Sequence, residues 1–586
     1  MKSILLSMSC ALLILISTAK AQNAISLKTN STTVLYANQG SEGWGQKNIT
    51  NWGDIVVLWY GTSQWLWYVN APAAGDYYVD LLYSVPAQSA GTDMEIASEN
   101  NPALPFKLEE TKGFIHDNGL IDGNKNYERR RLSQPMKISA GVHWLGLSSK
   151  NVASGRYLLN LRGVELTPVA ASAGIDSVNT ATVSSRADIS WMQNAVYGGM
   201  FHWTNMNVNQ QGNLVDFDTM VTNFNVDTFV KQAEDMGLGY VLFTIGHAFD
   251  YCPAPLQSWA KYHGNDHITQ RDLIMELADA LAAKNIKLML YFPTHTITKY
   301  CIHQTYDKST WDYNLTYETF YTSLTEIITE VGTRYGKKVS GYWFDGWYQC
   351  FEKFGEMDFK SFYATCKIGN PDRTISTNPW VLPTVTEWED YYGGEVFAIG
   401  DVPTSNIINY GPSKNKSLHF LITMEDDWVM VNTSKKIVID KDNLVPYVKA
   451  CQTSKIPVTV NLLVYADGTV MTGSRDNMVY LKNNIVKSLP VSVDAGKNKR
   501  FGGFESKSNK SDLPRLELNG QNRIVITNAG NRKDVSFSLT DLQGRKILSE
   551  TFSGTNGMMA RPVCNGVYFY KIKFDNKVIS DKLSVF

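Results

Sequence analysis

A single carboxylate follows a short apolar run in the middle of the chain. The run Val339–Phe344 ends at Asp345, and Gly346 and Trp347 come next. A long amphipathic segment, roughly 316–336, leads into the run, so this order predicts a helix and then a buried strand with an acid at its carboxyl end. The aromatic neighbours offer flat apolar faces for sugar rings. We therefore take Asp345 as the candidate nucleophile of a glycoside hydrolase; the alternative is an Asp that caps the next turn.

Residues 189–490 alternate between apolar strands and amphipathic helices, which is the pattern of a (β/α)8 barrel. We expect the part after the fifth and sixth strands to be irregular, because no convincing helix follows either of them. The expected strands are Tyr197–Trp203, Tyr240–His247, Lys287–Thr294, Val339–Gly346, Arg373–Asn378, Val396–Val402, Leu418–Met424 and Val458–Val464, and the expected helices are Asp227–Met236, Thr269–Lys284, Tyr317–Tyr335, Asp442–Ser454 and Asp476–Lys487.

Polar side chains gather where these strands end, which is where barrels of this kind carry their chemistry. The group consists of His202, His247, His295, Asp345, Asn378, Glu387, Glu389, Asp401, Glu425 and Asp427. A zinc site from the three histidines is an alternative, but no HxH or HExxH spacing supports it. We expect neither a metal nor a cofactor.

The flanking segments are rich in short strands. Residues 22–168 alternate without a helical period, which predicts a β-sandwich. The phrases Trp67–Val79 and Gly141–Leu147 resemble sandwich carbohydrate-binding modules. Residues 169–188 are expected to be a linker, and residues 491–512 a second, polar linker.

The chain ends suggest export. A basic start, a short apolar run and an Ala-x-Ala site predict a signal peptide over residues 1–21. Residues 513–586 resemble the C-terminal sorting domain of type IX secretion substrates, on the phrases Leu539–Arg545 and Asn565–Tyr570 and the final-strand Lys582. This resemblance implies a small β-sandwich, a secreted or cell-surface location and the type IX machinery as a partner. We expect no transmembrane segment, and the net charge of -1 gives no indication of nucleic-acid binding.

Four phrases carry a family resemblance for the barrel: Gly199–Trp203, Phe229–Thr244, Tyr342–Gly346 and Thr459–Thr469. Together they resemble the α-L-fucosidase family of retaining glycoside hydrolases over most of residues 190–490. The family's usual β-sandwich after the barrel is missing here. The resemblance implies a secreted exo-glycosidase acting on a terminal α-L-fucosyl or related deoxysugar residue of a glycan.

The resemblance also implies roles for individual residues. Asp345 falls on the nucleophile, His202 and Trp203 on the pair that lines the sugar pocket, and His247 on the first histidine of the Lys-His-His-Asp-Gly phrase. The family's acid/base glutamate lies in a loop after the fifth strand. The candidates in that loop are Glu387, which we prefer, and Glu389; the further substrate-binding candidates are Tyr291, Trp343 and Trp388.

The chemistry requires two carboxyl groups about 5–5.5 Å apart, one to form a glycosyl ester and one to donate and then remove a proton. Ala248 and Phe249 replace the second histidine and the aspartate of the family phrase, which leaves the sugar open. Two alternatives stand: another glycosidase that uses Asp401 or Glu425 as the acid, and an inactive surface glycan-binding protein.

Overall fold

In the computed structural model the chain forms two compact units, Met1–Pro490 and Val491–Phe586. In the first unit the described residues are 24–49, 57–111, 115–116, 126–247, 251–294, 315–347, 350, 354, 357–378, 386–395, 399–400, 402–403, 405–408 and 415–487. In the second unit they are 515–518, 523–527, 535–541, 546–552, 559–562, 566–574 and 577–585. The predicted signal peptide lies outside the described residues.

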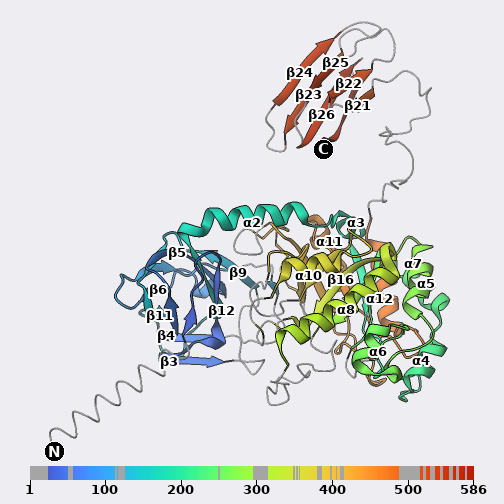
Figure 1. Ribbon diagram of the computed structural model, residues 1–586, viewed down its shortest axis with the longest axis horizontal. Helices are drawn as coiled ribbons and strands as arrows, with labels where there is room; N and C mark the ends of the chain where they lie inside the picture. Colours follow the sequence, from blue (N-terminus) through green and yellow to red (C-terminus); the bar gives the residue numbers. More distant parts are fainter. Residues whose placement is uncertain are drawn as a thin grey trace, which may run out of the picture. The chain divides into compact units, whose positions relative to one another are not determined.

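A parallel eight-stranded sheet forms the centre of the first unit and curls into a nearly closed barrel (Figure 1). Its hydrogen-bonded order is β17-β16-β15-β14-β13-β20-β19-β18. Such a parallel sheet is covered on its outer face, so its strands read as almost continuous apolar runs. The strands are β13 (Tyr197–Phe201), β14 (Tyr240–Thr244), β15 (Lys287–Pro293), β16 (Val339–Asp345), β17 (Thr374–Thr377), β18 (Tyr391–Glu395), β19 (Ser417–Thr423) and β20 (Val458–Asn461).

Helices surround the barrel, and four of the longer ones begin with a side-chain cap. Asn225, Asp272, Thr316 and Asp440 each accept a hydrogen bond from a backbone N–H in the first turn of the helix that follows. The helices are α3 (Ser190–Ala195), α4 (Phe217–Asn223), α5 (Val226–Asp235), α6 (Gln257–His263), α7 (Leu273–Ala282), α8 (Tyr317–Tyr335), α10 (Phe359–Cys366), α11 (Lys441–Thr453) and α12 (Thr472–Asn484). All five predicted helices are confirmed within a few residues at each end.

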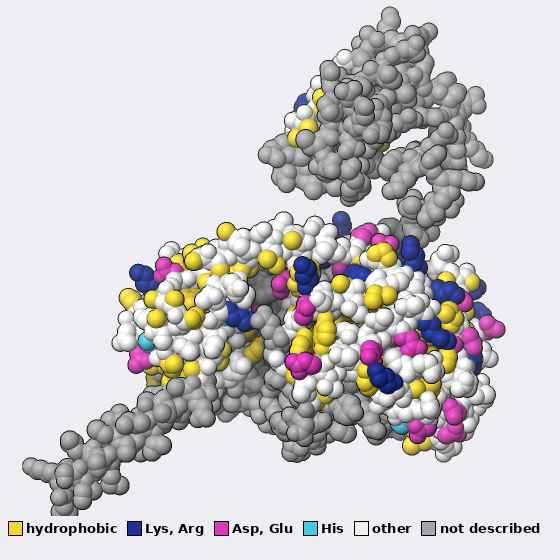
Figure 2. All heavy atoms as spheres, viewed as in Figure 1, with side chains coloured by type: hydrophobic (Ala, Val, Ile, Leu, Met, Phe, Trp, Pro, Cys, Tyr) yellow, Lys and Arg dark blue, Asp and Glu magenta, His cyan; other side chains and the backbone are white. Residues whose placement is uncertain are grey.

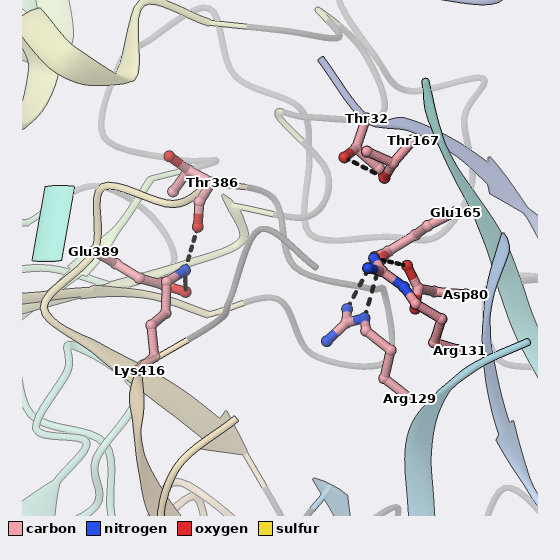
Figure 3. Close-up of polar contacts among 9 residues, drawn as sticks. All are labelled: Thr32, Asp80, Arg129, Arg131, Glu165, Thr167, Thr386, Glu389 and Lys416. Atoms are coloured by element: carbon pink, nitrogen blue, oxygen red, sulfur yellow. Dashed lines mark hydrogen bonds and ion pairs between the residues drawn. The ribbon is translucent and has the colours of Figure 1, made fainter. Parts of the chain in front are cut away.

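The barrel has a seam between β17 and β18, where no backbone ladder joins the described residues. A backbone hydrogen bond crosses it, from the Asp390 N–H to the Ile375 oxygen at 2.9 Å, and carboxylates add further contacts. Asp390 Oδ2 accepts from the Ile375 backbone N–H at 2.7 Å, and Glu389 Oε2 accepts from the Thr377 N–H at 3.2 Å. Lys416 pairs with Glu389 at 2.6 Å, and both side chains are buried. Figure 3 shows this pair with Thr386. Among the described residues the seam is therefore held by charged side chains together with a backbone hydrogen bond.

The sixth strand differs from the prediction. It was expected at Val396–Val402 and is observed as β18 at Tyr391–Glu395. The strand reads Tyr-Tyr-Gly-Gly-Glu, and the acids Glu389 and Asp390 directly before it are held by groups from other elements. Between β17 and β19 the described residues contain no helix, which agrees with the expected irregularity.

The N-terminal region forms one connected sheet of twelve strands, with β4, β5, β11 and β12 at its centre. The halves of β4 pair with different partners, since its first residues pair with β12 and its later ones with β11. The strands are β1 (Ile25–Ser26), β2 (Thr33–Tyr36), β3 (Ser41–Ile49), β4 (Val57–Ala71), β5 (Gly75–Ser84), β6 (Asp93–Ser98), β7 (Leu104–Lys107), β8 (Ile115–His116), β9 (Asn126–Arg131), β10 (Met136–Ile138), β11 (Gly141–Ser149) and β12 (Tyr157–Pro168).

This N-terminal sheet packs against the barrel beside the seam. Tyr36 and Leu82 belong to the same continuous apolar core as the outer face of the barrel, and β8 contacts β18. Arg129 and Glu165 form a buried bidentate pair in the sheet, drawn in Figure 3 with Lys416 and Glu389 of the barrel. The N-terminal sheet therefore lies against β18. The expected linker contains a helix, α2 (Ser172–Ser185).

The second unit contains two antiparallel sheets. One has the order β21-β22-β25 and the other β24-β23-β26-β27. Val535, Phe537 and Leu539 alternate as buried residues along β23, as expected for a sheet with one covered face. The strands are β21 (Arg515–Leu518), β22 (Arg523–Thr527), β23 (Val535–Asp541), β24 (Lys546–Phe552), β25 (Met559–Pro562), β26 (Gly566–Phe574) and β27 (Lys577–Val585).

On the face shown in Figure 2, acidic and basic side chains are interspersed and do not gather by sign. Within the described part of the chain, no helix has the length and apolar character that a membrane span requires.

Candidate active site

Asp345 is the last residue of β16, at the carboxyl end of the barrel, and both of its carboxylate oxygens accept hydrogen bonds. The Tyr291 hydroxyl on β15 donates to Oδ2 at 2.5 Å. The Asn378 side-chain amide, directly after β17, donates to Oδ1 at 2.9 Å. Two neighbouring strands thus orient one carboxylate, in the accepting role that an ionised carboxyl group fills.

A second carboxyl group lies beside Asp345 and was missed in the sequence. Glu395, the last residue of β18, accepts a hydrogen bond through Oε2 from the same Asn378 nitrogen that donates to Asp345. An amide nitrogen carries two hydrogens, so it can serve both acids. Two hydrogen bonds that meet at one nitrogen hold the accepting oxygens within about 6 Å of each other, because a hydrogen bond is no longer than about 3 Å.

Aromatic rings form the wall next to this pair. The His202 ring lies edge-on to the rings of His247 at 5.3 Å, Tyr291 at 4.8 Å and Trp428 at 5.3 Å between centroids. His247 stacks on Tyr291 at 5.5 Å, and Tyr291 stacks on Trp343 at 5.7 Å. The structure therefore brings together four predicted residues, His202, His247, Tyr291 and Trp343, around Asp345.

His202 is held from a further strand. Its Nδ1 lies 2.9 Å from the Oδ1 of Asn461 on β20. Burial lowers the pKa of His202; the hydrogen bond to Asn461 and the charges of Asp345 and Asp427 oppose this shift. The neutral imidazole is therefore the form that this site favours.

The two predicted acid/base glutamates lie in the seam. Glu389 is 1% exposed, and its oxygens are held by Lys416 and Thr377. The charge of Glu387 acts on Arg186 and Lys416 in the same place, and its backbone oxygen accepts from Arg186. The described contacts bring neither carboxylate to Asp345.

The predicted tryptophans have different surroundings. Trp203 is 2% exposed and packs on Phe217, Phe224 and Phe243 in the layer between barrel and helices, so its ring is not part of the wall around His202. Trp343 lies inside the barrel beneath Tyr291.

Trp388 is half-buried, with the Lys360 ammonium 6.0 Å from its ring centre. Phe344 and Trp347, which flank Asp345 in the sequence, are fully buried in the outer core.

The remaining candidates do not join the site. His295 and Asp401 lie outside the described residues. Glu425 is 1% exposed and accepts from the Ser474 hydroxyl at the start of α12, and burial raises its pKa to about 8. Within the described residues, no group of three or more His, Cys, Asp or Glu side chains could hold a metal ion.

Two of the residues that build the site carried a usable signal. Asn378 follows a predicted strand, and Asn461 lies inside the motif Thr459–Thr469. Glu395 carried none, because it comes directly before the apolar residues that the sequence predicts as the sixth strand. The segment Gly393–Glu395 is recognised as the end of a barrel strand only in the folded structure, where β18 pairs with β19.

The family comparison agrees with this architecture. Residues 171–445 match the family model described as Alpha-L-fucosidase. Residues 171–445 therefore contain an α-L-fucosidase family domain, as the sequence resemblance predicted, and this supports glycoside hydrolase activity.

The chain is also similar to solved fucosidase structures at low identity. One is alpha-L-fucosidase AlfC from Lactobacillus casei in complex with alpha-L-fucose product, with 17% identity, a TM-score of 0.38, and coverage of 50% of this chain and 96% of that chain. Another is a bacterial fucosidase with a monovalent iminocyclitol inhibitor, with 16% identity, a TM-score of 0.38, and coverage of 68% and 97%. No curated protein matches the chain.

The second unit has its own match. Residues 519–585 match the model described as Secretion system C-terminal sorting domain. This domain marks the chain for type IX secretion and places it outside the cell or on its surface.

Proposed function

We propose that this protein is a retaining exo-glycosidase that hydrolyses terminal α-L-fucosyl, or related deoxysugar, residues of glycans. The observation that carries the proposal is the pair Asp345 and Glu395, linked through Asn378 at the carboxyl end of the barrel. Retaining glycosidases hold their two carboxyl groups about 5–5.5 Å apart. The shared amide supports this spacing, because it holds the two accepting oxygens within about 6 Å of each other. The family match supports the choice of sugar.

In the first step Asp345 attacks the anomeric carbon. A bond forms between a carboxylate oxygen of Asp345 and that carbon, and the bond to the leaving oxygen breaks. Glu395 gives its proton to the leaving oxygen, so the aglycone departs as a neutral alcohol. The Tyr291 hydroxyl and the Asn378 amide keep the Asp345 carboxylate oriented towards the sugar.

In the second step the same two residues exchange tasks. Glu395, now ionised, removes a proton from a water molecule, and the water oxygen attacks the anomeric carbon of the glycosyl ester. The ester bond breaks, Asp345 is released as a carboxylate, and Glu395 is protonated again. Two inversions give a product with the configuration of the substrate.

The predicted acid/base residues Glu387 and Glu389 are replaced by Glu395 in this proposal. The reason is position, because Glu389 stabilises the seam through Lys416 and Thr377.

The predictions for the flanking segments stay proposals: a signal peptide over residues 1–21, a carbohydrate-binding sandwich over residues 22–168 and a small sandwich over residues 513–586. The 46% exposed Trp44 on β3 supports the binding role, since an exposed indole suits a sugar ring.

The test is hydrolysis of 4-nitrophenyl α-L-fucoside by the wild-type protein, followed by proton NMR during the first turnovers. We expect release of 4-nitrophenol and the α-anomer of fucose as the first product. 4-Nitrophenyl β-D-galactoside serves as the control substrate, and we expect it to be a poorer one. A β-anomer as the first product would contradict the retaining mechanism, and hydrolysis of the galactoside alone would contradict the sugar.

A further inference from the structure

The side-chain amide of Asn461 has a defined orientation. Its Nδ2 donates to the Trp428 backbone oxygen at 3.2 Å. A carbonyl oxygen can only accept, so the nitrogen of the amide must be the atom on that side. The Oδ1 atom therefore points to His202 Nδ1, 2.9 Å away. Asn461 is fully buried, which makes any other arrangement costly because it would leave buried polar atoms unpaired.

This orientation determines which nitrogen of His202 carries hydrogen. An amide oxygen has no hydrogen to give, so His202 Nδ1 must be the donor in the contact with Asn461. A neutral imidazole carries a single hydrogen, and Nε2 is then left as a bare acceptor. No hydrogen bond joins Nε2 to another described residue.

The charges around His202 act in opposite directions. Asp345 and Asp427 face it and favour the protonated ring, while burial favours the neutral ring. Lys435 pairs with Asp427 and offsets part of that negative charge. The other groups around the ring are His247, Tyr291 and Trp428.

We infer that Asn461 is a positioning residue that holds His202 as the Nδ1–H tautomer, so that Nε2 accepts a hydrogen bond from a hydroxyl group of the substrate. This inference rests on the proposed function only for the nature of the ligand. It deepens that proposal, because it requires a hydroxyl group of the sugar to donate a hydrogen bond to His202 on one wall of the site. A sugar whose matching hydroxyl is methylated would leave a buried acceptor unpaired and bind more weakly.

The same amide also fixes a loop. Through the Trp428 oxygen, Asn461 ties the segment after β19 to the end of β20. Trp428 lies against His202, so one side chain controls both the tautomer of the histidine and the indole that packs on it. Loss of the Asn461 amide should therefore weaken substrate binding more than it slows bond cleavage.

The direct experiment is nitrogen NMR of the full chain labelled with 15N-histidine and without substrate. The signal of His202 is assigned by its loss in the His202→Gln variant. We expect one protonated and one unprotonated ring nitrogen at neutral pH, with the proton on Nδ1. A proton on Nε2, or on both nitrogens, would overturn the inference. Because no substrate is present, the result is independent of whether the protein cleaves fucosides.

A kinetic experiment follows with Asn461→Asp. A carboxylate still accepts from Nδ1, but its charge favours the protonated ring, so Nε2 becomes a donor. We expect kcat/KM on 4-nitrophenyl α-L-fucoside to fall at least tenfold at neutral pH, mainly through a higher KM, and to recover towards alkaline pH.

Asn207→Asp is the matched control. Asn207 is an equally buried amide whose side chain bonds only to Thr204 and the Val464 backbone oxygen. We expect this variant to keep the wild-type pH profile, even if it is less stable. The same profile in both aspartate variants would overturn the positioning role of Asn461.

Discussion

Asp345 and Glu395 accept hydrogen bonds from one and the same side-chain nitrogen, that of Asn378. The two acids lie fifty positions apart in the chain, at the ends of β16 and β18, and the residue between them follows β17. Three successive barrel strands thus build the pair. The amide fixes the spacing of the carboxyl groups, which is the property that decides between retention and inversion.

Removing the acid should affect the chemistry and leave the fold intact. We expect Glu395→Gln to lower kcat/KM by about 10²–10⁴-fold on a fucosyl disaccharide, because general acid catalysis contributes that much. The loss should be smaller on 4-nitrophenyl α-L-fucoside, whose aglycone leaves without a proton. Rates on both substrates provide the measurement.

Glu389→Gln is the comparison for that experiment. It leaves the buried Lys416 ammonium without its ion-pair partner, so we expect a lower melting temperature. We expect no difference between the two substrates in the fraction of activity that remains. A selective loss on the disaccharide in Glu389→Gln, and none in Glu395→Gln, would refute the assignment.

Tyr291→Phe removes one of the two donors to the Asp345 carboxylate. A hydrogen bond to a charged group is worth about 1.5–3 kcal/mol, so we expect kcat to fall roughly 10–100-fold. Tyr197→Phe loses a hydroxyl that bonds only to the Met236 backbone oxygen in the outer layer, and it should keep the wild-type kcat. Equal kcat values for the two variants would contradict the role of Tyr291.

Glu425 should make the stability of the first unit fall as pH rises. Burial raises its pKa from the usual 4.5 to about 8. Between these two pH values the unfolded chain releases the proton and the folded chain keeps it. The free energy of unfolding therefore falls by about 1.4 kcal/mol per pH unit through this group. Below 4.5 and above 8 the contribution is constant.

Melting temperatures between pH 5 and 8 test this expectation. Glu425→Gln cannot ionise, so it should match the wild type near pH 5 and melt at a higher temperature near pH 8. Asp426→Asn, an exposed neighbour, should follow the wild type at every pH. A constant difference between Glu425→Gln and the wild type over this range would show that Glu425 does not titrate there.

The N-terminal sheet should unfold together with the barrel. Arg129 and Glu165 have side chains only 2% and 1% exposed, so Arg129→Met leaves a buried charge and should cost about 3–5 kcal/mol. Arg130→Met, on the same strand but 35% exposed, should cost less than about 1 kcal/mol. Urea unfolding followed at the barrel tryptophans checks this, and an unchanged barrel midpoint in Arg129→Met would mean that the sheet unfolds alone.

Much of the barrel could be predicted from apolar runs, since a parallel sheet covered on its outer face needs almost continuous apolar strands. β16 with its terminal Asp345 illustrates this. The rule fails at β18, which lies at the seam and has polar flanks held by side chains of other elements. Glu395 was missed for that reason, since its strand was placed a few residues too late.

The aromatic neighbours of Asp345 show a second limit. Along a strand, successive side chains point to opposite faces, so only Trp343 turns into the barrel while Phe344 faces outward. In the same way, the Trp203 side chain lies in the outer core, whereas the His202 ring lies against Tyr291 in the site. Proximity to Asp345 in the sequence therefore does not identify the residues of the pocket wall. The alternation of side chains along the strand identifies them, once it is known which face of the strand points into the barrel.

The most direct test uses azide with two alanine variants and 4-nitrophenyl α-L-fucoside. We expect Asp345→Ala to lose about 10⁴-fold or more in kcat and to form the β-fucosyl azide, since azide attacks the substrate directly. Glu395→Ala should form the α-fucosyl azide, because azide then attacks the ester on Asp345. Formation of the α-azide by Glu389→Ala, with no azide product from Glu395→Ala, would contradict the account.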